Sequence, residues 1–489
     1  MEESAIRKGF DDLADGKKYD NLYAAALCRA KADWLIGING TRLFTTLYKG
    51  KTLNVGRVLT PTLTLLAERE AAIQNFKKEK FYTVELDLRT FRASSGKFNS
   101  KTDAEKLRTA CLGKTAVVQS VTRKDKAERP PKLYDLTTLQ REANRLFDYT
   151  AQQTLDYLQS LYEKRLATYP RTDSRYLTED MADGLPALCS TVAGALSFMA
   201  GQPLPVNATQ VVDSSKVTDH HAVIPTAEIA SADLAALPTG ERNILHLIAA
   251  RLLCAVGEPH TYAETAVTLE CGGSAFTAKG RTVTEAGWKA LEKAFLSALK
   301  QNVKPEEPAP TLPKLAEGQR LEDADAILKQ RTTAPPLRFT EDTLLSAMEH
   351  ASAEDFAALE SVERAGLGTP ATRAATIEKL VRSGFVERKK KQLVPTEKGL
   401  AVTKAMPEPL KSAKLTAEWE GLLGMVERGE LAPDNFMAGI VDMVKGLVKS
   451  YQNVTVAPST LSRSNRPVIG VCPRCGKNVV EGKKSFFCE

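Results

Sequence analysis

The periodicity of apolar residues changes four times along this 489-residue chain, and these changes limit the folds open to it. Apolar residues recur at helical spacing at first and alternate with polar residues from Phe81 to Leu88. Helical spacing then returns, alternation reappears from Tyr262 to Cys271, and the remainder is helical. A β-rich domain that is interrupted by one helical domain and inserted into another produces this order. We therefore expect a multidomain protein of mixed α and β class.

The expected domain boundaries follow these changes of period. They are residues 1–80 (helical, first part), 81–126 (β-rich, first part), 127–257 (helical), 258–335 (β-rich, second part), 336–451 (helical and winged-helix-like), 452–470 (flexible linker) and 471–489 (partial zinc ribbon). A Pro-rich linker at 304–313 precedes the final helices. The winged-helix prediction rests on a helix, a tight turn at Gly384 and a basic hairpin, Glu387–Pro395.

Composition and charge exclude few classes of function. Charged residues make up 26% of the chain and hydrophobic residues 43%, which is ordinary for a soluble protein. The net charge of +7 permits a polyanionic partner without requiring one. No apolar run approaches the roughly 18 residues of a membrane span, and acidic residues rather than a signal peptide follow Met1. We expect a cytoplasmic monomer without a membrane partner.

The eight cysteines fall into two groups. Five lie scattered in apolar or helical stretches, which is typical of reduced core thiols: Cys28, Cys111, Cys189, Cys254 and Cys271. The other three, Cys472, Cys475 and Cys488, have the spacing of a zinc ribbon. A structural zinc site needs four ligands, and one residue follows the third cysteine. The sequence therefore predicts an incomplete Zn²⁺ site.

The stretch ATYPRTDSRYL, residues 167–177, is the most informative for chemistry. A tyrosine is far more often a packing residue than a nucleophile, but Tyr169 follows an amphipathic helix and precedes a proline, which favours a surface position. Arg171 lies two residues on, where an extended backbone places both side chains on one side. Its guanidinium would bind phosphate and favour the phenolate, and Asp173 would hold Arg171 in place. These residues suit attack on a phosphodiester.

This stretch closely resembles the active-site motif of type IA DNA topoisomerases, and the resemblance extends to about residue 450. Further matching segments occur in the order that the family shows: RAKADWLIGINGTR (29–42), GRVLTPTL (56–63), DHHAVIPT (219–226) and GLGTPATR (366–373). The DHHAVIPT form and the tyrosine–proline pair are similar to the topoisomerase III branch. The resemblance implies a gate of helical and winged-helix-like domains that a β-rich domain joins.

The resemblance also implies the reaction. Tyr169 would form a 5′-phosphotyrosine with single-stranded DNA, Arg171 would stabilise the phosphoryl charge, and His220 would position the scissile phosphate. Transesterification exchanges one phosphoester for another, so no nucleotide triphosphate is needed. Consistently, neither Gly-Lys-Thr triplet, at 50–52 and 113–115, has the upstream glycine of a P-loop.

Other matching residues suggest DNA contacts. Adjacent His220 and His221 would point opposite ways on a strand, so at most one faces the site, and the resemblance selects His220. Phosphate binding is expected at four positions, against the alternative of a solvated basic face: Arg29, Arg57, Thr372 and Arg373. The basic run at residues 388–391 is expected to be a solvated wing rather than a specific site.

The family places a Toprim domain, which holds Mg²⁺ through a glutamate and an Asp-x-Asp pair, before the segment with which this chain begins. The one such pair here, Asp323-Ala-Asp325, follows the Pro-rich linker, and its sequence context does not suggest a strand, so we expect no role in metal binding. The sequence therefore predicts a fragment that lacks the Mg²⁺ site and is cut within a zinc ribbon, and that is inactive alone.

Two other classes of function remain open. The chain would also suit a non-catalytic module that binds single-stranded DNA through the same gate. A winged-helix regulator with a zinc ribbon would explain residues 340–489 but not the first 300. Trapping a covalent protein–DNA adduct would separate the enzyme from either binding protein.

Overall fold

The computed structural model describes residue 7 and residues 9–48, 52–200, 204–299, 311–351, 366–455, 468–481 and 485–488. The chain divides into two compact units. Unit 1 is formed by residues 1–71 and 338–489, and unit 2 by residues 72–337. The expected mixed α and β class is confirmed. None of the described helices is long and apolar enough to cross a membrane.

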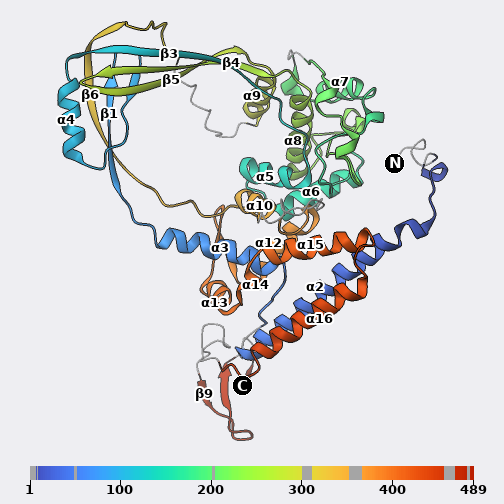
Figure 1. Ribbon diagram of the computed structural model, residues 1–489. Helices are drawn as coiled ribbons and strands as arrows, with labels where there is room; N and C mark the ends of the chain where they lie inside the picture. The colour runs from blue at the N-terminus through green and yellow to red at the C-terminus, as the bar shows by residue number, and fades with distance from the viewer. Residues whose placement is uncertain are drawn as a thin grey trace. The chain divides into compact units, whose positions relative to one another are not determined.

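A closed β-barrel forms one part of unit 2, with strand order β1-β2-β5-β4-β3-β6 (Figure 1). Its strands are β1 (Lys80–Asp87), β2 (Arg92–Ser94), β3 (Lys114–Glu128), β4 (His260–Cys271), β5 (Ser274–Glu285) and β6 (Arg320–Thr332). Helix α4 (Lys101–Cys111) lies against β1 and β6, and its N-cap, Ser100, accepts a hydrogen bond from the amide of Asp103. The strands bury alternate side chains, such as Val84 and Leu86, inside the barrel.

The barrel pairs residues that are distant in sequence. Strand β3 runs antiparallel to β4 from Val117↔Glu270 to Glu128↔His260, so residues 129–259 leave and re-enter the barrel at neighbouring positions. In the same way, β1 pairs with β6 from Lys80↔Thr332 to Asp87↔Asp325. Most of the helical part of unit 2 is thus inserted between two paired strands. The seven-part domain division given above stays a prediction.

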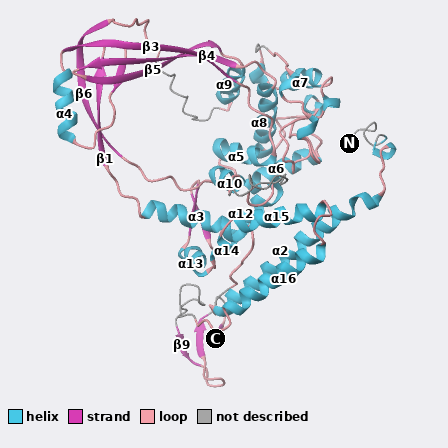
Figure 2. Cartoon of the chain, viewed as in Figure 1, coloured by secondary structure: helices cyan, strands magenta, loops and turns pink. Residues whose placement is uncertain are grey.

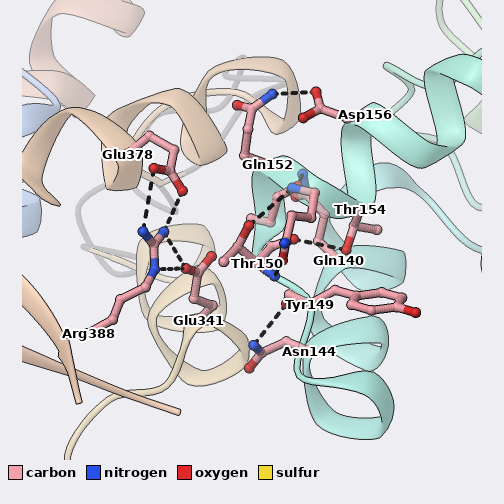
Figure 3. Close-up of polar contacts among 12 residues, drawn as sticks. Gln140, Asn144, Tyr149, Thr150, Gln152, Thr154, Asp156, Glu341, Glu378 and Arg388 are labelled. Atoms are coloured by element: carbon pink, nitrogen blue, oxygen red, sulfur yellow. Dashed lines mark hydrogen bonds and ion pairs between the residues drawn. The ribbon is translucent and has the colours of Figure 1, made fainter. Parts of the chain in front are cut away.

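The chain that connects β3 to β4 forms helices that lie at one end of these two strands, as Figure 2 shows. They are α5 (Leu136–Phe147), α6 (Ala151–Glu163), α7 (Leu185–Gly194) and α8 (Thr239–Ala255), with α9 (Trp288–Ala298) following β5. Thr150 and Gln153 form a capping box that starts α6, and Asn144 donates a hydrogen bond to the carbonyl of Tyr149 in the preceding turn (Figure 3). Helix α8 is apolar on nearly every side and lies at the centre of the core of this region.

Unit 1 is mainly helical. Its helices are α2 (Asp20–Leu47), α3 (Leu59–Gln74), α10 (Glu341–Glu349), α12 (Pro370–Arg382), α13 (Glu397–Ala405), α14 (Glu408–Lys411), α15 (Lys414–Glu427) and α16 (Pro433–Ser450). Helix α2 packs against α15 and α16 through a buried stripe that includes Ala25, Ala32 and Ile36. A separate three-stranded sheet near the C-terminus contains β9 (Val468–Val471), β10 (Asn478–Glu481) and β11 (Phe486–Cys488).

The predicted helix, turn and hairpin after residue 370 are present. Gly384 has φ +70°, a left-handed conformation that glycine adopts without strain, and it links α12 to β7 (Val386–Lys389) and β8 (Gln392–Pro395). The expectation of a solvated wing is wrong for Arg388. Its guanidinium donates to Glu341 at 2.7 Å and also pairs with Glu378 (Figure 3). Arg388 therefore ties the hairpin to α10 and α12.

Two further expectations need comment. Asp323 and Asp325 do lie on a strand, β6, contrary to the expected context, and Asp323 pairs with Arg89 at 3.3 Å in the barrel wall. Most of the linkers expected at 304–313 and 452–470 lies outside the described residues.

Candidate functional site

The segment that carries Tyr169 is held in place by a second segment some fifty residues later. The Thr168 amide donates to the carbonyl of Ile224 at 3.0 Å, and the Thr168 hydroxyl donates to the carbonyl of Ala222 at 3.1 Å. The Thr172 hydroxyl donates to the carbonyl of His220 at 2.7 Å. Because these bonds flank Tyr169, the backbone on both sides of the tyrosine is fixed while its ring stays partly exposed.

Tyr169 and His220 lie face to face. Their ring centroids are 4.1 Å apart, and the ring planes are inclined by 33°. His220 is exposed, whereas the neighbouring His221 is partly buried with Nδ1 2.9 Å from the carbonyl oxygen of Ala222. Burial lowers the pKa of His221, which favours the neutral form of this residue in the folded protein. The segment is not a regular strand, but the two histidines do face different ways.

Arg171 lies at the surface beside α6. Its Nη1 donates to Oε1 of Gln159 at 3.0 Å, and its remaining donors face solvent. The expectation that Asp173 holds Arg171 is not met, because Asp173 accepts instead from the hydroxyl of Thr218 at 3.3 Å. Arg171 and Asp173 therefore make their hydrogen bonds to two different segments of the chain.

Two residues of α6 that the sequence did not single out complete this surface. Gln159 receives the bond from Arg171 and donates from its own amide to Glu163 at 2.9 Å. The ring of Tyr162 stands edge-on to Tyr169 at 5.6 Å between centroids. Gln159 and Tyr162 are three residues apart and share a helix face. This spacing, on the helix just before the tyrosine motif, is the sequence feature from which their position beside Tyr169 could have been predicted.

The expected DNA-binding arginines lie elsewhere, in unit 1. Arg29, Arg57 and Thr372 line a cavity of about 430 Å³ together with Asp33 and Glu420. Arg57 is 6% exposed, and all three of its nitrogens donate to carboxylates: Nε and Nη2 to Asp33 at 2.8 and 3.1 Å, and Nη1 to Glu420 at 2.9 Å. Burial alone would lower the pKa of Arg57, but these carboxylates raise it. Arg57 is thus a permanent cation that is already paired.

The segment GLGTPATR forms another wall of this cavity. Gly366 and Gly368 have φ values of +92° and +69°, and they lead the chain into the N-cap of α12 at Thr369. The Thr372 hydroxyl accepts from the Thr369 amide at 2.9 Å, completing a capping box. Arg373 is only 4% exposed, and its Nε donates to the carbonyl of Leu367 at 3.2 Å. Thr372 therefore remains accessible, and Arg373 fixes the loop.

The three C-terminal cysteines come together as their spacing predicts. The sulfur atoms of Cys472, Cys475 and Cys488 lie within 4.8 Å of one another, so the cluster can hold a metal ion. The Cys472 amide donates to the carbonyl of Lys477 at 2.8 Å, and Gly476, with φ +69°, closes the turn. Backbone amides that point at the sulfur of Cys472 lower its pKa to about 7, which favours the thiolate that zinc requires. Three thiolates supply three of the four ligands of a tetrahedral zinc site.

The described residues do not fit Mg²⁺ in the same way. Within the ranges that the structure describes, the cysteine cluster is the one group of three or more His, Cys, Asp or Glu ligand atoms close enough to share an ion. Mg²⁺ prefers carboxylate and water oxygens. We therefore assign no Mg²⁺ ligands in this part of the chain.

Comparisons with known proteins agree with these observations. Residues 17–438 match the family described as DNA topoisomerase. DNA topoisomerase 3 of Bacillus licheniformis is 38% identical, over 99% of this chain and 67% of the relative, and that of Bacillus subtilis is 38% identical over 99% and 68%. The solved structure of full-length topoisomerase I from Thermotoga maritima has a TM-score of 0.71 at 22% identity, covering 100% of this chain and 77% of that one. The structural likeness concerns the fold.

Proposed function

Because the chain belongs to the type IA DNA topoisomerase family and is similar to relatives named DNA topoisomerase 3, we propose that Tyr169 is the DNA-cleaving nucleophile. The observation that carries the proposal is the fixed, partly exposed ring of Tyr169 stacked on His220 at 4.1 Å. Family membership supports an enzyme rather than a non-catalytic binding module.

The reaction is a reversible exchange of phosphoesters. The Tyr169 Oη loses its proton and forms a bond to a backbone phosphorus of single-stranded DNA, the bond from phosphorus to the 3′-oxygen breaks, and that oxygen takes up a proton. A 5′-phosphotyrosine and a free 3′-hydroxyl result. After another strand passes, the 3′-hydroxyl attacks the phosphorus and the tyrosine hydroxyl is restored. The number of phosphoesters does not change, so the cycle needs no nucleotide triphosphate.

The neighbouring side chains have separate tasks. Arg171 has guanidinium donors that face solvent, and these bind the non-bridging oxygens as negative charge develops on the phosphoryl group. His220 contacts and orients the scissile phosphate next to the Tyr169 ring. Asp173 has only a supporting role, through the hydrogen bond that it accepts from Thr218.

A matched pair of tyrosine variants tests the nucleophile. Single-stranded DNA carrying a label is incubated with protein and Mg²⁺, and a covalent adduct is detected on a denaturing gel. We expect Tyr169→Phe to abolish the adduct and Tyr162→Phe, which removes a hydroxyl from the adjacent ring, to retain it. An adduct that persists in Tyr169→Phe, or is lost only in Tyr162→Phe, would remove the assignment.

We propose that carboxylates beyond the described residues supply Mg²⁺. The chain spans about two thirds of the length of its Bacillus relatives. We expect negligible relaxation of supercoiled DNA by the 489-residue chain alone and recovery when the N-terminal part of such a relative is fused to it. The tyrosine pair is therefore compared in this fusion. Robust relaxation by the chain alone would contradict the proposal.

Unit 1 is the proposed surface for single-stranded DNA. Arg29 and Thr372 are accessible from the same cavity. Contacts to phosphates give binding that falls steeply with salt and depends little on sequence. We expect tighter binding of single-stranded than duplex DNA, measured by fluorescence anisotropy. Equal and salt-independent affinity for both forms would count against this surface.

The cysteine cluster is proposed to bind Zn²⁺ through Cys472, Cys475 and Cys488. Because three protein thiolates leave one coordination position to water or another ligand, we expect weak binding that a mild chelator reverses. A colorimetric zinc assay before and after chelation measures this. Stoichiometric zinc that resists the chelator would show that a fourth ligand is present.

A further inference from the structure

Glu420 is shared by two arginines at the wall of the unit 1 cavity. Its Oε1 accepts from Nη1 of Arg57 at 2.9 Å, and its Oε2 accepts from Nη2 of Arg29. The Glu420 side chain is 14% exposed, so its charge is partly shielded from water. A single carboxylate thus compensates two cations from different parts of the chain.

The two arginines differ in how many donors they have left. Each nitrogen of Arg57 is hydrogen-bonded to a carboxylate, and its guanidinium also lies over the ring of Trp419, 5.3 Å from the centroid. The Arg29 side chain is 38% exposed, and its Nε is buried without a hydrogen-bond partner. A buried donor without a partner costs free energy until an acceptor reaches it. Arg29 therefore has more donor capacity left for an incoming ligand than Arg57, three of whose five N–H donors already bond to carboxylates.

The cavity beside Arg29 suits an anion. Besides the two arginines it is lined by Lys379 and by Thr369 and Thr372 at the N-terminus of α12, a 13-residue helix. The positive end of the helix dipole favours negative charge at this point. Asp33 and Glu420 oppose it from the same wall. Asp33 is engaged by two nitrogens of Arg57, so Glu420 decides how much positive charge Arg29 presents.

We propose that Glu420 sets the affinity for single-stranded DNA by exchanging partners. Without DNA it neutralises Arg29. When a backbone phosphate enters the cavity, Arg29 transfers its donors to the phosphate while Glu420 stays on Arg57. The exchange makes Glu420 an intramolecular competitor of the DNA, which weakens binding and eases the release of a strand. This inference rests on the proposed function of unit 1 as the single-strand surface.

Anisotropy measurements on the full chain with fluorescein-labelled oligothymidylate at low salt test the exchange. Glu420→Gln keeps an oxygen for Arg57 but removes the charge that competes for Arg29. We expect it to tighten binding about two- to fivefold, the range of a partly exposed ion pair. The control is Glu418→Gln, the same charge change at an exposed position of α15. It should alter affinity far less.

Arg29→Ala separates the exchange from the proposed function. We expect Arg29→Ala to weaken binding and to cancel the gain from Glu420→Gln in the double variant. Wild-type protein without salt-sensitive affinity for the oligonucleotide would overturn the proposed surface itself. Weakening by Arg29→Ala without any gain from Glu420→Gln would overturn the exchange alone, as would an equal gain from Glu418→Gln.

A second measurement does not depend on the stability of Glu420→Gln. In wild-type chain labelled with ¹⁵N-arginine, the Nε–H signals of Arg29 and Arg57 are assigned with Arg29→Lys and Arg57→Lys. On addition of the oligonucleotide we expect the Arg29 signal to shift and the Arg57 signal to stay. A shifted Arg57 signal beside an unchanged Arg29 signal would contradict the exchange.

Discussion

The tyrosine site in unit 2 and the arginine cluster in unit 1 treat their charged groups in opposite ways. At the tyrosine site, His220 and Arg171 are exposed, and Arg171 makes one hydrogen bond to a neutral side chain. In the cluster, Arg57 is 6% exposed and bonded to two carboxylates. Both regions contain segments that match motifs of the same family.

The difference indicates what each region is built for. Groups that must meet a phosphate keep their donors available, so removing them should cost activity and little stability. Groups that are buried and paired hold the backbone around the cavity, so removing one weakens the compensation of its partner's charge in a shielded place. A motif arginine can therefore be reactive or structural, and its bonding partners decide which.

Arg171→Ala should produce the largest effect on the reaction. Losing one preorganised donor to developing charge typically lowers a rate by about 10²- to 10³-fold. The Arg171 side chain is exposed, so the free energy of unfolding should change by less than about 0.5 kcal/mol. Cleavage of labelled single-stranded DNA in the fusion protein and a urea titration measure the two quantities. Arg145→Ala, at an exposed position of α5, is the control and should affect neither. A large loss of stability in Arg171→Ala would show that Arg171, like Arg57, has a structural role, and the two regions would not differ in this respect.

Arg57→Ala should have the opposite profile. It leaves Glu420 paired with Arg29 alone and Asp33, whose side chain is 43% exposed, without this partner, and we expect the unfolding free energy to fall by about 1 to 2 kcal/mol. Urea denaturation followed by tryptophan fluorescence measures this, since Trp419 lies beside the guanidinium. Arg57→Lys should recover only part of the loss, because an ammonium cannot reproduce the paired bonds to Asp33. Unchanged stability in Arg57→Ala would show that the ion pairs of Arg57 do not stabilise the fold.

The two adjacent histidines repeat the comparison over a shorter distance. His220→Ala should slow cleavage by about tenfold to a hundredfold, by analogy with other residues that position reacting groups, with stability nearly unchanged. His221→Ala should instead lower stability by about 1 kcal/mol through lost packing and leave the cleavage step largely intact. Single-turnover cleavage and thermal unfolding distinguish them. Reversed profiles would mean that the sequence motif selects the wrong histidine.

The smallest effect is a pH dependence of stability. Burial lowers the folded-state pKa of His221, so its neutral form is favoured in the folded protein. Its contribution is complete above the unfolded histidine pKa of about 6.5 and is lost as pH falls through the lower folded value. His221→Gln should therefore flatten the decline in stability on the acidic side. His246, whose pKa burial also lowers, gives a second case for the same test. If stability declined as steeply in His221→Gln as in the wild-type protein, the titration of His221 would not be the cause.

Local patterns predicted the local structure well. The strand expected at Phe81–Leu88 is β1, and the helix, turn and hairpin after residue 370 are present. The sequence also selected Tyr169 and His220, which the structure brings together from segments far apart. Their catalytic roles remain proposals.

Bonding partners could not be predicted, because they depend on how distant segments meet. Arg388 lies in a basic run, yet Glu341, 47 residues earlier, pairs with it. Gln159, rather than Asp173, receives the bond from Arg171, since the end of α6 runs beside the tyrosine segment. Closure of the barrel depends on β3–β6 and β1–β6 pairing, which periodicity does not encode. The sequence predicted the secondary-structure elements, but the contacts between them depend on the three-dimensional arrangement of distant segments.

The pairing of β3 with β4 has a consequence for how such a gene can change. Glu128 and His260 are neighbours in the barrel, so everything encoded between them enters and leaves at one point. Lys80 and Thr332 are also paired neighbours, so the chain enters unit 2 and leaves it at a second common point. Insertions or deletions next to these two places would change the connecting chain without separating the paired strands. The chain between Glu128 and His260 can therefore change in length without parting β3 from β4, provided that α8 still packs against α9, which follows β5.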